Sequence, residues 1–375
     1  MEERKLLSGN GSEDKPFCSE NGTAGIQQEL DGLAERGGIL QLVSGRYDIE
    51  KSILIDTPSL CLTGGIWACN TDPNGAFETR FGTKIRMHGT HYPALIVGSK
   101  CDPIAGTVIR DLGIQGDISG MDTRPLADFT APEKAAGLCF DSIRTDQCEF
   151  SKLSFCGLGC AVAAIGNAEL DACLFEKLNT DGCGNGFWFS PRASYYTRIR
   201  SCVVADTPYY GFYLGGEGKL IHNLELQDCY FVRNGGAFSG DPIPAAVFFD
   251  HASCCAITNC IFDAPGIFWY YDDNATENRQ RQPSAQPIPG LRILGNENRI
   301  RNNTFLNSSD DSIRIEGDRN ILIGNIADGN VRISGEGNVV SSLVFTTPEA
   351  RLILEGAAAH STVLHGVEEW RIVKK

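Results

Sequence analysis

The sequence is poor in the residues on which several classes of function depend. It has only 6 histidines among 375 residues, and they are scattered, so no zinc constellation is indicated. Its formal net charge is −14 and it has no basic block, which disfavours a nucleic-acid-binding groove. The same charge repels an acidic polysaccharide such as pectate, unless a bound cation reverses the local field. We expect no metal, no cofactor and no nucleic-acid partner.

Long hydrophobic runs are also missing. No window approaches the roughly 20 apolar residues of a transmembrane span, and no apolar stretch follows the charged start MEERK. We therefore expect no membrane partner and no signal peptide, and we predict a cytoplasmic protein. Cysteine, in contrast, is abundant at 15 residues, which in that compartment are expected to be reduced thiols.

One amphipathic helix is indicated near the start of the chain. In AGIQQELDGLAERGG the apolar residues Ile26, Leu30 and Leu33 follow helical spacing, and Gly37-Gly38 ends the pattern. The sequence predicts a helix over 24–36. Helical periodicity then disappears, and 42 glycines suit many tight turns between short strands.

An internal repeat replaces the helical pattern. The phrases DACLF, RSCVV, QDCYF, TNCIF, RNNTF and IGNIA share a polar residue, then Cys or Asn, then an apolar pair. Repeats spaced by about 20–50 residues indicate stacked supersecondary units, here the coils of a right-handed parallel β-helix. The marked residues are expected to form an inward-facing ladder, with amide bonds from coil to coil at the asparagines. They are Cys173, Cys202, Cys229, Cys260, Asn303 and Asn325.

The repeat predicts the domain organisation. We expect an N-terminal tail over 1–20 and a single all-β domain, a right-handed parallel β-helix with an N-terminal capping helix, over 21–375. Two insertions, 115–137 and 272–290, interrupt the coils. A leucine-rich repeat is excluded because no helical segment and no leucine consensus recur.

The helix, the run GGILQLVSGRYDIEKSILI and the later LTGG resemble the opening motif of pectate-lyase-like right-handed β-helix proteins. Within that superfamily the order VIRDLGIQGD, an acidic loop, EKAAGLCF and SKLSFCGLGCAVAAIG is similar to the inulin fructotransferases. The resemblance implies a catalytic pair made of an aspartate that closes one coil and a glutamate that opens the next. By position these are Asp117 and Glu133. It also implies a possible homotrimer.

The residues themselves favour the same loop. Chemistry at a glycosidic bond needs two carboxyl groups, one protonated as acid and one ionised as base or nucleophile. The stretch 115–137 supplies Asp117, Asp122, Asp128 and Glu133, with Arg124 available to orient a carboxylate or bind a hydroxyl. The alternative is a solvated acidic loop without a role.

Three segments concentrate aromatic residues, at 186–196, 207–214 and 267–273. Aromatic rings offer flat apolar faces to a sugar ring, and alternation along a strand places some rings outside and others in the core. With polar neighbours they form the predicted substrate-binding set. Its members are Asp122, Arg124, Asp181, Trp188, Arg192, Tyr209, Tyr210, Trp269 and Tyr270.

The sequence favours a carbohydrate-active enzyme that cleaves or rearranges glycosidic bonds of a neutral oligosaccharide, of the glycoside hydrolase or fructotransferase type. The alternatives are a non-catalytic glycan-binding or structural β-helix module, or a polysaccharide lyase. NTDG at 179–182 and DD at 310–311 are like the carboxylates of polygalacturonases, but they lie several coils apart here. For a calcium-dependent pectate lyase, Asp206 and Arg198 are conceivable, although no diagnostic run exists.

Overall fold

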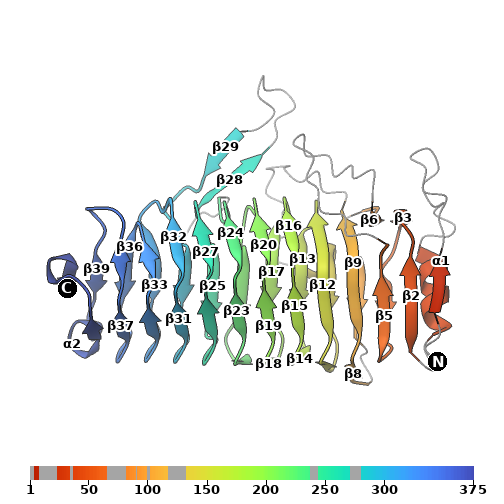
Figure 1. Cartoon of the computed structure of the whole chain (residues 1–375), viewed down its shortest axis with the longest axis horizontal. Helices are drawn as coiled ribbons and strands as arrows, with labels where there is room; N and C mark the ends of the chain where they lie inside the picture. Colours follow the sequence, from red (N-terminus) through yellow and green to blue (C-terminus); the bar gives the residue numbers. More distant parts are fainter. Residues whose placement is uncertain are drawn as a thin grey trace. The chain divides into compact units, whose positions relative to one another are not determined.

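The computed structural model describes residues 4–7, 23–33, 37–65, 82–89, 91–98, 102–116, 132–236, 244–270 and 280–375. Short strands dominate, and they pair in parallel with strands of the adjacent coil, for example β10 (Ala136–Phe140) with β13 (Cys160–Ala164). The predicted all-β, right-handed parallel β-helix is therefore confirmed (Figure 1). Most of the predicted insertion 115–137 and part of 272–290 lie outside the described residues.

The chain divides into two compact units, which we describe separately. Unit 1 comprises Met1–Ala193 and Tyr270–Gln280, and unit 2 comprises Ser194–Trp269 and Arg281–Lys375. In both units the coils contribute strands to two large parallel sheets, called sheets 1 and 2 below, and some coils add a strand to a smaller parallel sheet, called sheet 3. The prediction of a single domain over 21–375 stays a prediction.

In unit 1, sheet 1 contains β1 (Arg4–Leu7), β2 (Gly38–Leu42), β3 (Gly45–Ile49), β5 (Leu60–Thr63), β6 (Thr83–Met87), β9 (Val108–Gln115), β12 (Glu149–Cys156), β15 (Leu174–Glu176) and β16 (Asn179–Asp181). Sheet 2 contains β4 (Ile53–Ile55), β7 (Leu95–Val97), β10, β13 and β17 (Asn185–Phe189). Sheet 3 contains β8 (Ile104–Ala105), β11 (Thr145–Asp146) and β14 (Glu169–Asp171), and β18 (Ala193–Tyr195) lies at the unit boundary.

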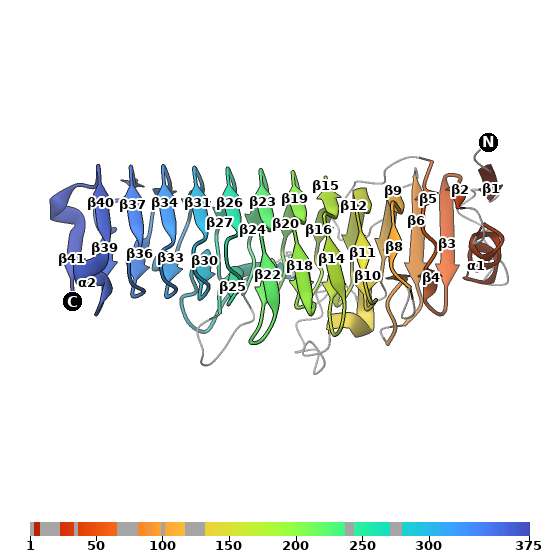
Figure 2. The same cartoon turned by 90° about the horizontal axis from the view of Figure 1, so that it is seen from below.

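In unit 2, sheet 1 contains β19 (Arg198–Arg200), β20 (Val203–Ala205), β23 (Glu225–Gln227), β24 (Tyr230–Val232), β26 (Ala256–Thr258), β27 (Ile261–Asp263), β31 (Arg299–Arg301), β32 (Thr304–Leu306), β34 (Ile321–Ile323), β35 (Ile326–Ala327), β37 (Val339–Ser341), β38 (Val344–Phe345) and β40 (Val363–His365). Sheet 2 contains β21 (Phe212–Gly215), β25 (Val247–Asp250), β30 (Leu291–Ile293), β33 (Asp311–Ile315), β36 (Asn330–Ile333), β39 (Leu352–Leu354) and β41 (Ile372–Lys374), and β22 (Leu220–His222) belongs to sheet 3. Figure 2 shows β31, β34 and β37 side by side.

Two short α-helices, two 3-10 helices and a separate strand pair complete the described elements. They are α1 (Thr23–Asp31), α2 (Ala358–Ser361), the 3-10 helices η1 (Pro132–Ala135) and η2 (Glu369–Arg371), and the two-stranded sheet of β28 (Ile267–Tyr270) and β29 (Gln280–Pro283). No helix in the described ranges is long and apolar enough to cross a membrane.

The helix α1 covers the open edge of sheet 2 in unit 1. Ile26, Leu30 and Leu33 are buried, as their spacing predicted, although the helix itself ends at Asp31. The Gln27 side chain accepts a hydrogen bond from Leu54 N (2.8 Å) and donates one to Leu54 O (3.1 Å). The amide of Gln27 thus occupies the place of another strand, which protects an edge that otherwise invites pairing with a second chain.

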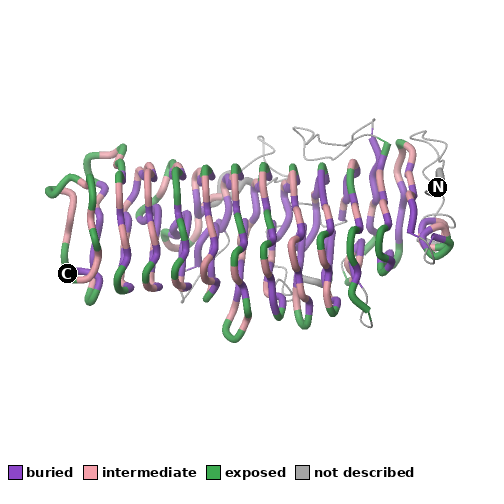
Figure 3. Tube along the Cα trace, turned by 60° about the horizontal axis from the view of Figure 1, so that its bottom comes forward, coloured by how far each residue is buried: buried purple, intermediate pink, exposed green. Residues whose placement is uncertain are grey.

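Each repeated phrase marks one bend of its own coil. In unit 2 the polar residue of each phrase has a positive φ, 55° at Ser201, 53° at Asp228 and 55° at Asn259. Asparagine and aspartate tolerate this left-handed conformation better than most residues because their short side chains bond locally. The next residue is then directed inward, and Cys202, Cys229, Cys260, Asn303 and Asn325 are all buried. Figure 3 shows the buried residues alternating with exposed ones along the coils.

The predicted inward ladder is confirmed in unit 2, and it satisfies backbone groups of the neighbouring coils. Asn303 Oδ1 accepts a hydrogen bond from Cys260 N (2.8 Å), and Asn325 Oδ1 accepts one from Asn303 N (3.0 Å). A second ladder, which the sequence reading missed, runs through Asn298, Asn320 and Asn338 with the same geometry. Buried polar backbone groups are costly when unpaired, so these amides stabilise coil stacking.

Stacked phenylalanine rings fill the interior beside the ladders. In unit 1 the ring centroids of Phe150 and Phe175 are 4.9 Å apart, and in unit 2 those of Phe262 and Phe305 are 4.5 Å apart with planes at 4°. Burial raises the pKa of the Cys255 thiol to about 12, which keeps this thiol protonated near neutral pH. The expected reduced cysteines agree with the free thiols found among the described residues.

Replacing Asn320 with alanine tests the second ladder. The change leaves Asn298 N and Gly295 O without the Asn320 side chain, which now bonds both at 2.8 and 3.1 Å. We expect Asn320→Ala to lower the free energy of unfolding by about 2–4 kcal/mol, because each buried unpaired group costs about 1–3 kcal/mol. Urea unfolding followed by circular dichroism measures this. The exposed Arg319→Gln serves as control and should change it by less than about 0.5 kcal/mol; equal effects of the two would contradict a structural role for the ladder.

Candidate functional site

The residues predicted to carry catalysis are only partly described. Asp117, Asp122 and Arg124 lie outside the described residues. Glu133 lies in η1, whose backbone is described but whose Glu133 side chain is not. Trp269 and Tyr270 end β28, and their side chains are not described either. The predicted pair Asp117–Glu133 therefore stays a prediction, but the place where its loop joins the fold can be described.

The loop that contains these acids leaves and rejoins unit 1 at the corner between sheets 1 and 2. Before it, Gly116 N donates to Cys156 O (2.9 Å), and a Cβ on Gly116 would lie 2.1 Å from Gly157 O. After it, Gly159 N donates to Ala135 O (2.9 Å). Both ends of the excursion are thus fixed on the same corner of the next coil. Long insertions at such corners commonly carry functional residues.

Small side chains make room for η1 on the outer face of sheet 2. Ala136, Cys139, Cys160 and Ala163 form a cluster that is at most 4% exposed, and Trp188 packs against it. A Cβ on Gly159 would lie only 3.1 Å from the Ala135 Cβ, a tight contact that glycine avoids. The turn that holds Glu133 and the predicted sugar-binding Trp188 therefore flank one patch of unit 1.

Asp181 lies at the same corner, one coil further on. It ends β16 and is in register with Cys156 at the end of β12. Burial raises the pKa of Cys156 to about 12, with a further contribution from the Asp181 carboxylate. Burial likewise raises the pKa of Cys183. The structure thus places Asp181 at the end of its strand in sheet 1, beside Cys156 of the preceding coil.

Arg192, which was predicted to bind substrate, forms an ion pair on the surface of unit 1. Its Nη2 forms an ion pair with Glu169 Oε2, and its side chain is exposed. The neighbouring pair of Arg144 and Asp171, at 2.7 Å, is similar. Such surface pairs contribute little to stability. Because the pair of Arg192 resembles that of Arg144, its geometry does not single out Arg192 as a substrate-binding residue.

In unit 2 the outer face of sheet 2 carries an aromatic platform. The ring centroids of Tyr210 and Tyr213 are 5.2 Å apart, and those of Tyr213 and Phe248 are 5.8 Å apart. Burial raises the pKa of Tyr210 to about 12 and also raises that of Tyr209, so both phenols stay protonated. The predicted Tyr210 belongs to this platform. Tyr213 and Phe248 were not predicted, because nothing in FYLG or VFFD reveals which faces of the strands meet.

Polar groups border the platform. The Tyr213 hydroxyl donates to Asp250 Oδ2 (2.6 Å), and His251 Nδ1 lies 2.7 Å from Asp250 Oδ1. Burial, followed by the hydrogen bond to Asp250, raises the pKa of Tyr213. The Arg292 guanidinium lies 5.1 Å from the centroid of the Phe248 ring, within the range of a cation–π contact.

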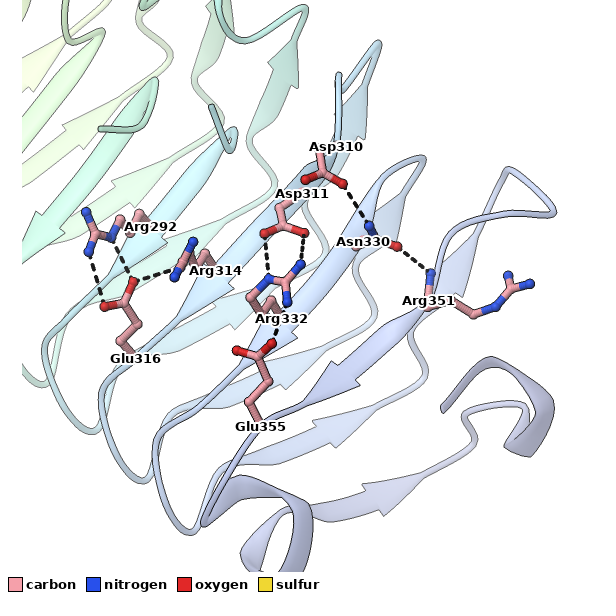
Figure 4. Close-up of polar contacts among 9 residues, drawn as sticks. All are labelled: Arg292, Asp310, Asp311, Arg314, Glu316, Asn330, Arg332, Arg351 and Glu355. Carbon is pink, nitrogen blue, oxygen red and sulfur yellow. Dashed lines mark hydrogen bonds and ion pairs between the residues drawn. The ribbon is translucent and has the colours of Figure 1, made fainter. Parts of the chain in front are cut away.

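A row of arginines continues the platform along sheet 2 of unit 2. Arg292, Arg314 and Arg332 occupy matching outward positions of β30, β33 and β36. Glu316 accepts hydrogen bonds from Arg292 Nε (2.9 Å) and Arg314 Nε (2.9 Å). Asp311 accepts one from Arg332 Nε (2.9 Å), as Figure 4 shows. Like charges on neighbouring strands repel, so the carboxylates are required to hold the row together.

A hollow of about 320 Å³ opens beside this row. Its lining combines a short apolar wall with charged side chains. These residues are Pro287, Ile288, Pro289, Asp310, Asp311, Arg314, Arg332 and Glu355. Asp311 is buried and Asp310 is exposed, so the two adjacent carboxyl groups have different surroundings.

The aspartate considered for a calcium-dependent lyase site has another partner. Asp206, conceivable as part of a calcium-dependent lyase site with Arg198, instead forms a bidentate ion pair with Arg233 at 2.6 Å. Among the described residues, no group of three or more His, Cys, Asp or Glu side chains is arranged to hold a metal ion.

The protonation of Asp311 gives a test of these surroundings. Burial raises the pKa of Asp311 and outweighs the hydrogen bonds from Arg332, which lower it. A raised carboxyl pKa means that the folded protein binds this proton more tightly, so its contribution to stability is present at low pH and is lost as pH rises through the folded-state pKa. The free energy of unfolding of the wild type minus that of Asp311→Asn should therefore be larger at about pH 3 than at about pH 6.

Glu297 supplies an internal control of opposite sign. Hydrogen bonds from Arg319 and Cys254 lower its pKa, so its contribution is lost on acidification. The difference between the wild type and Glu297→Gln should shrink from about pH 6 to about pH 3. If the Asp311→Asn difference also shrank, attraction to Arg332 rather than burial would dominate at Asp311.

The comparisons with known proteins agree on the fold. The sequence matches no protein-family model and no curated protein. The DFA-IIIase from Arthrobacter chlorophenolicus A6 in complex with GF2 is similar in structure, with a TM-score of 0.68 and 15% identity, covering 99% of this chain and 96% of that one. The same enzyme without its lid gives a TM-score of 0.69 at 17% identity, covering 99% and 96%.

A viral protein is also similar. Geobacillus virus E2 ORF18 gives a TM-score of 0.51 at 13% identity and covers 94% of this chain but only 56% of its own. At such identities these similarities show the fold alone. The β-helix architecture that the sequence resemblance implied is thereby confirmed along almost the whole chain.

Proposed function

We propose that this protein is a carbohydrate-active enzyme that cleaves or rearranges glycosidic bonds of a neutral oligosaccharide. The observation that carries the proposal is the corner of unit 1, where the acidic excursion rejoins the coil at the small-residue cluster on which Trp188 packs, and where Asp181 ends β16. An aromatic ring and carboxyl groups beside one another are what a sugar site requires.

The similar structures support the substrate class. The DFA-IIIase of Arthrobacter chlorophenolicus A6 has been solved with GF2 and with DFA-III, both fructo-oligosaccharide ligands. We extend that ligand class, neutral oligosaccharides of fructose, to this chain. Its net charge of −14 is in keeping with a neutral rather than an acidic substrate.

In the proposed reaction Asp117 and Glu133 divide the acid and base roles. One carboxyl group donates its proton to the oxygen of the glycosidic bond as that bond breaks. The other carboxylate takes a proton from the attacking hydroxyl group, which belongs to water in a hydrolase or to the substrate itself in a fructotransferase. Trp188 presents an aromatic face to a sugar ring, and Asp181 accepts hydrogen bonds from its hydroxyl groups.

One alternative has support from the comparisons. The similarity to a viral protein fits a structural or glycan-binding β-helix without catalysis. Such a module would bind an oligosaccharide and release it unchanged. The two functions differ in a single observable, the appearance of products.

Conservative substitution of the proposed acids tests the enzyme function. We expect the wild type to convert at least one of inulin, GF2 and DFA-III, with products detected by chromatography. Asp117→Asn and Glu133→Gln should each lower turnover by about 10²–10⁴-fold, the usual contribution of a general acid or base.

The exposed Glu349→Gln, which is far from any proposed chemistry in sequence and lies in unit 2, is the matched control and should keep full turnover. All three variants should melt within a few degrees of the wild type. Binding without products would favour the non-catalytic alternative, and full activity of both acid variants would disprove the site assignment. Cleavage of pectate only when calcium is present would point to a lyase.

A further inference from the structure

The hollow in unit 2 is lined by none of the residues used in the proposed reaction. Its walls come from residues 287–289, from Asp310, Asp311 and Arg314, from Arg332 in β36 and from Glu355, which follows β39. A volume of about 320 Å³ lies at the lower end of the range of small-molecule sites, about 300–1,000 Å³. The hollow is therefore large enough for one small ring and too small for an extended chain.

The arginine at the centre of the hollow is fully engaged by protein groups. Arg332 donates from Nε to Asp311 (2.9 Å) and from Nη1 to Glu355 (2.6 Å). These bonds fix the orientation of both carboxylates before any ligand arrives (Figure 4). Preorganised polar groups of this kind lose little entropy on binding.

Other polar atoms of the hollow keep unused hydrogen-bonding capacity. Arg314 is engaged only through Nε, by Glu316, and among the described residues nothing bonds its two terminal nitrogens. Glu355 uses one oxygen for Arg332, and Asp310 uses one for Asn330 Nδ2 (3.0 Å). In the described part of the chain the second oxygen of each carboxylate has no partner. The hollow thus offers donors and acceptors together.

This combination selects the class of ligand. A group that must both donate and accept hydrogen bonds is a hydroxyl, and adjacent hydroxyls match a guanidinium next to carboxylates. An anion is disfavoured, because three carboxylates outnumber the two guanidinium groups in the lining. The proline wall, Pro287 and Pro289, supplies apolar surface for the C–H face of a ring.

We propose that this hollow is a binding site for a neutral sugar unit, a single polyhydroxylated ring. Arg314 donates to its hydroxyl groups, Asp310 and Glu355 accept from them, and the ring lies against Pro287 and Pro289. The site does not depend on the proposed acid–base pair, since every residue in it belongs to unit 2. It binds sugar whether or not unit 1 turns sugar over.

The test uses the full chain and a reporter inside the hollow. The methyl groups of Ile288, a lining residue that is 1% exposed, are labelled with carbon-13 and followed by NMR. D-glucose, D-fructose and sucrose are titrated as neutral probes, with D-glucuronate and glycine as anionic and zwitterionic comparators. We expect the Ile288 signal to shift with at least one neutral probe and with neither comparator.

Variants show whether the named side chains bind the probe. Arg314→Gln and Asp310→Ala should each raise its Kd about tenfold, as the loss of one charged hydrogen bond does. Pro287→Glu, at an exposed position, should block the hollow without disturbing the fold. Arg319→Gln, another arginine of unit 2 whose exposed ion pair with Glu297 lies outside the lining, should bind normally.

Each other outcome overturns the proposal. No shift with any neutral probe at its solubility limit would leave the hollow a structural ion-pair cluster, and so would unchanged Kd values in Arg314→Gln and Pro287→Glu. Tighter binding of D-glucuronate or glycine would disprove the ligand class. The Glu133→Gln variant separates the two proposals, because it should lose turnover while the Ile288 shift persists.

Discussion

The rest of the structure depends on one constraint: the backbone N–H and C=O groups at the inward-facing bend of each coil must find hydrogen-bond partners. A short strand must turn within one residue, and the turn leaves backbone groups inside a closed stack without water. In unit 2 the asparagine amides bond the main chain of the preceding coil, as Asn303 does with Cys260 N and Ile257 O. Cysteine fits the same position because its small thiol packs well and donates weakly, for example from Cys202 Sγ to Arg200 O.

This requirement at the bends is why the fold could be predicted from the sequence. A bend residue with positive φ followed by Cys or Asn recurs from Gln147-Cys148 to Gly324-Asn325, so phrases such as RSCVV and RNNTF indicate these coils without any use of strand propensity. The capping helix was equally visible, because Ile26, Leu30 and Leu33 follow helical spacing over an uninterrupted stretch. The second ladder through Asn298, Asn320 and Asn338 was missed, although each of these asparagines follows a glycine by three residues, as in GNEN, GDRN and GEGN.

The candidate sites were less visible, for a different reason. Stacking places residues from successive coils in rows about 4.8 Å apart, but only the register between strands decides which residues share a row. Tyr213, Phe248 and Arg292 lie side by side although dozens of residues separate them in the chain. Trp188 and Asp181 were predicted because aromatic and acidic residues stand out in composition, whereas a single arginine in LRI or NVRI does not.

The outward rows also show how a charged surface and a stable coil coexist. Three arginines stacked on adjacent strands repel one another, and the fold tolerates them only because Glu316, Asp311 and Glu355 stand between them. Each carboxylate must then lie within hydrogen-bonding distance of arginines or other groups from two neighbouring coils. This requirement keeps the charged side chains separated along the sheet. Pro287 and Pro289 line the hollow and have no backbone N–H to donate to these carboxylates, so the space between the charged side chains stays open to a ligand. The hollow is in this sense a consequence of holding like charges in register along a parallel sheet.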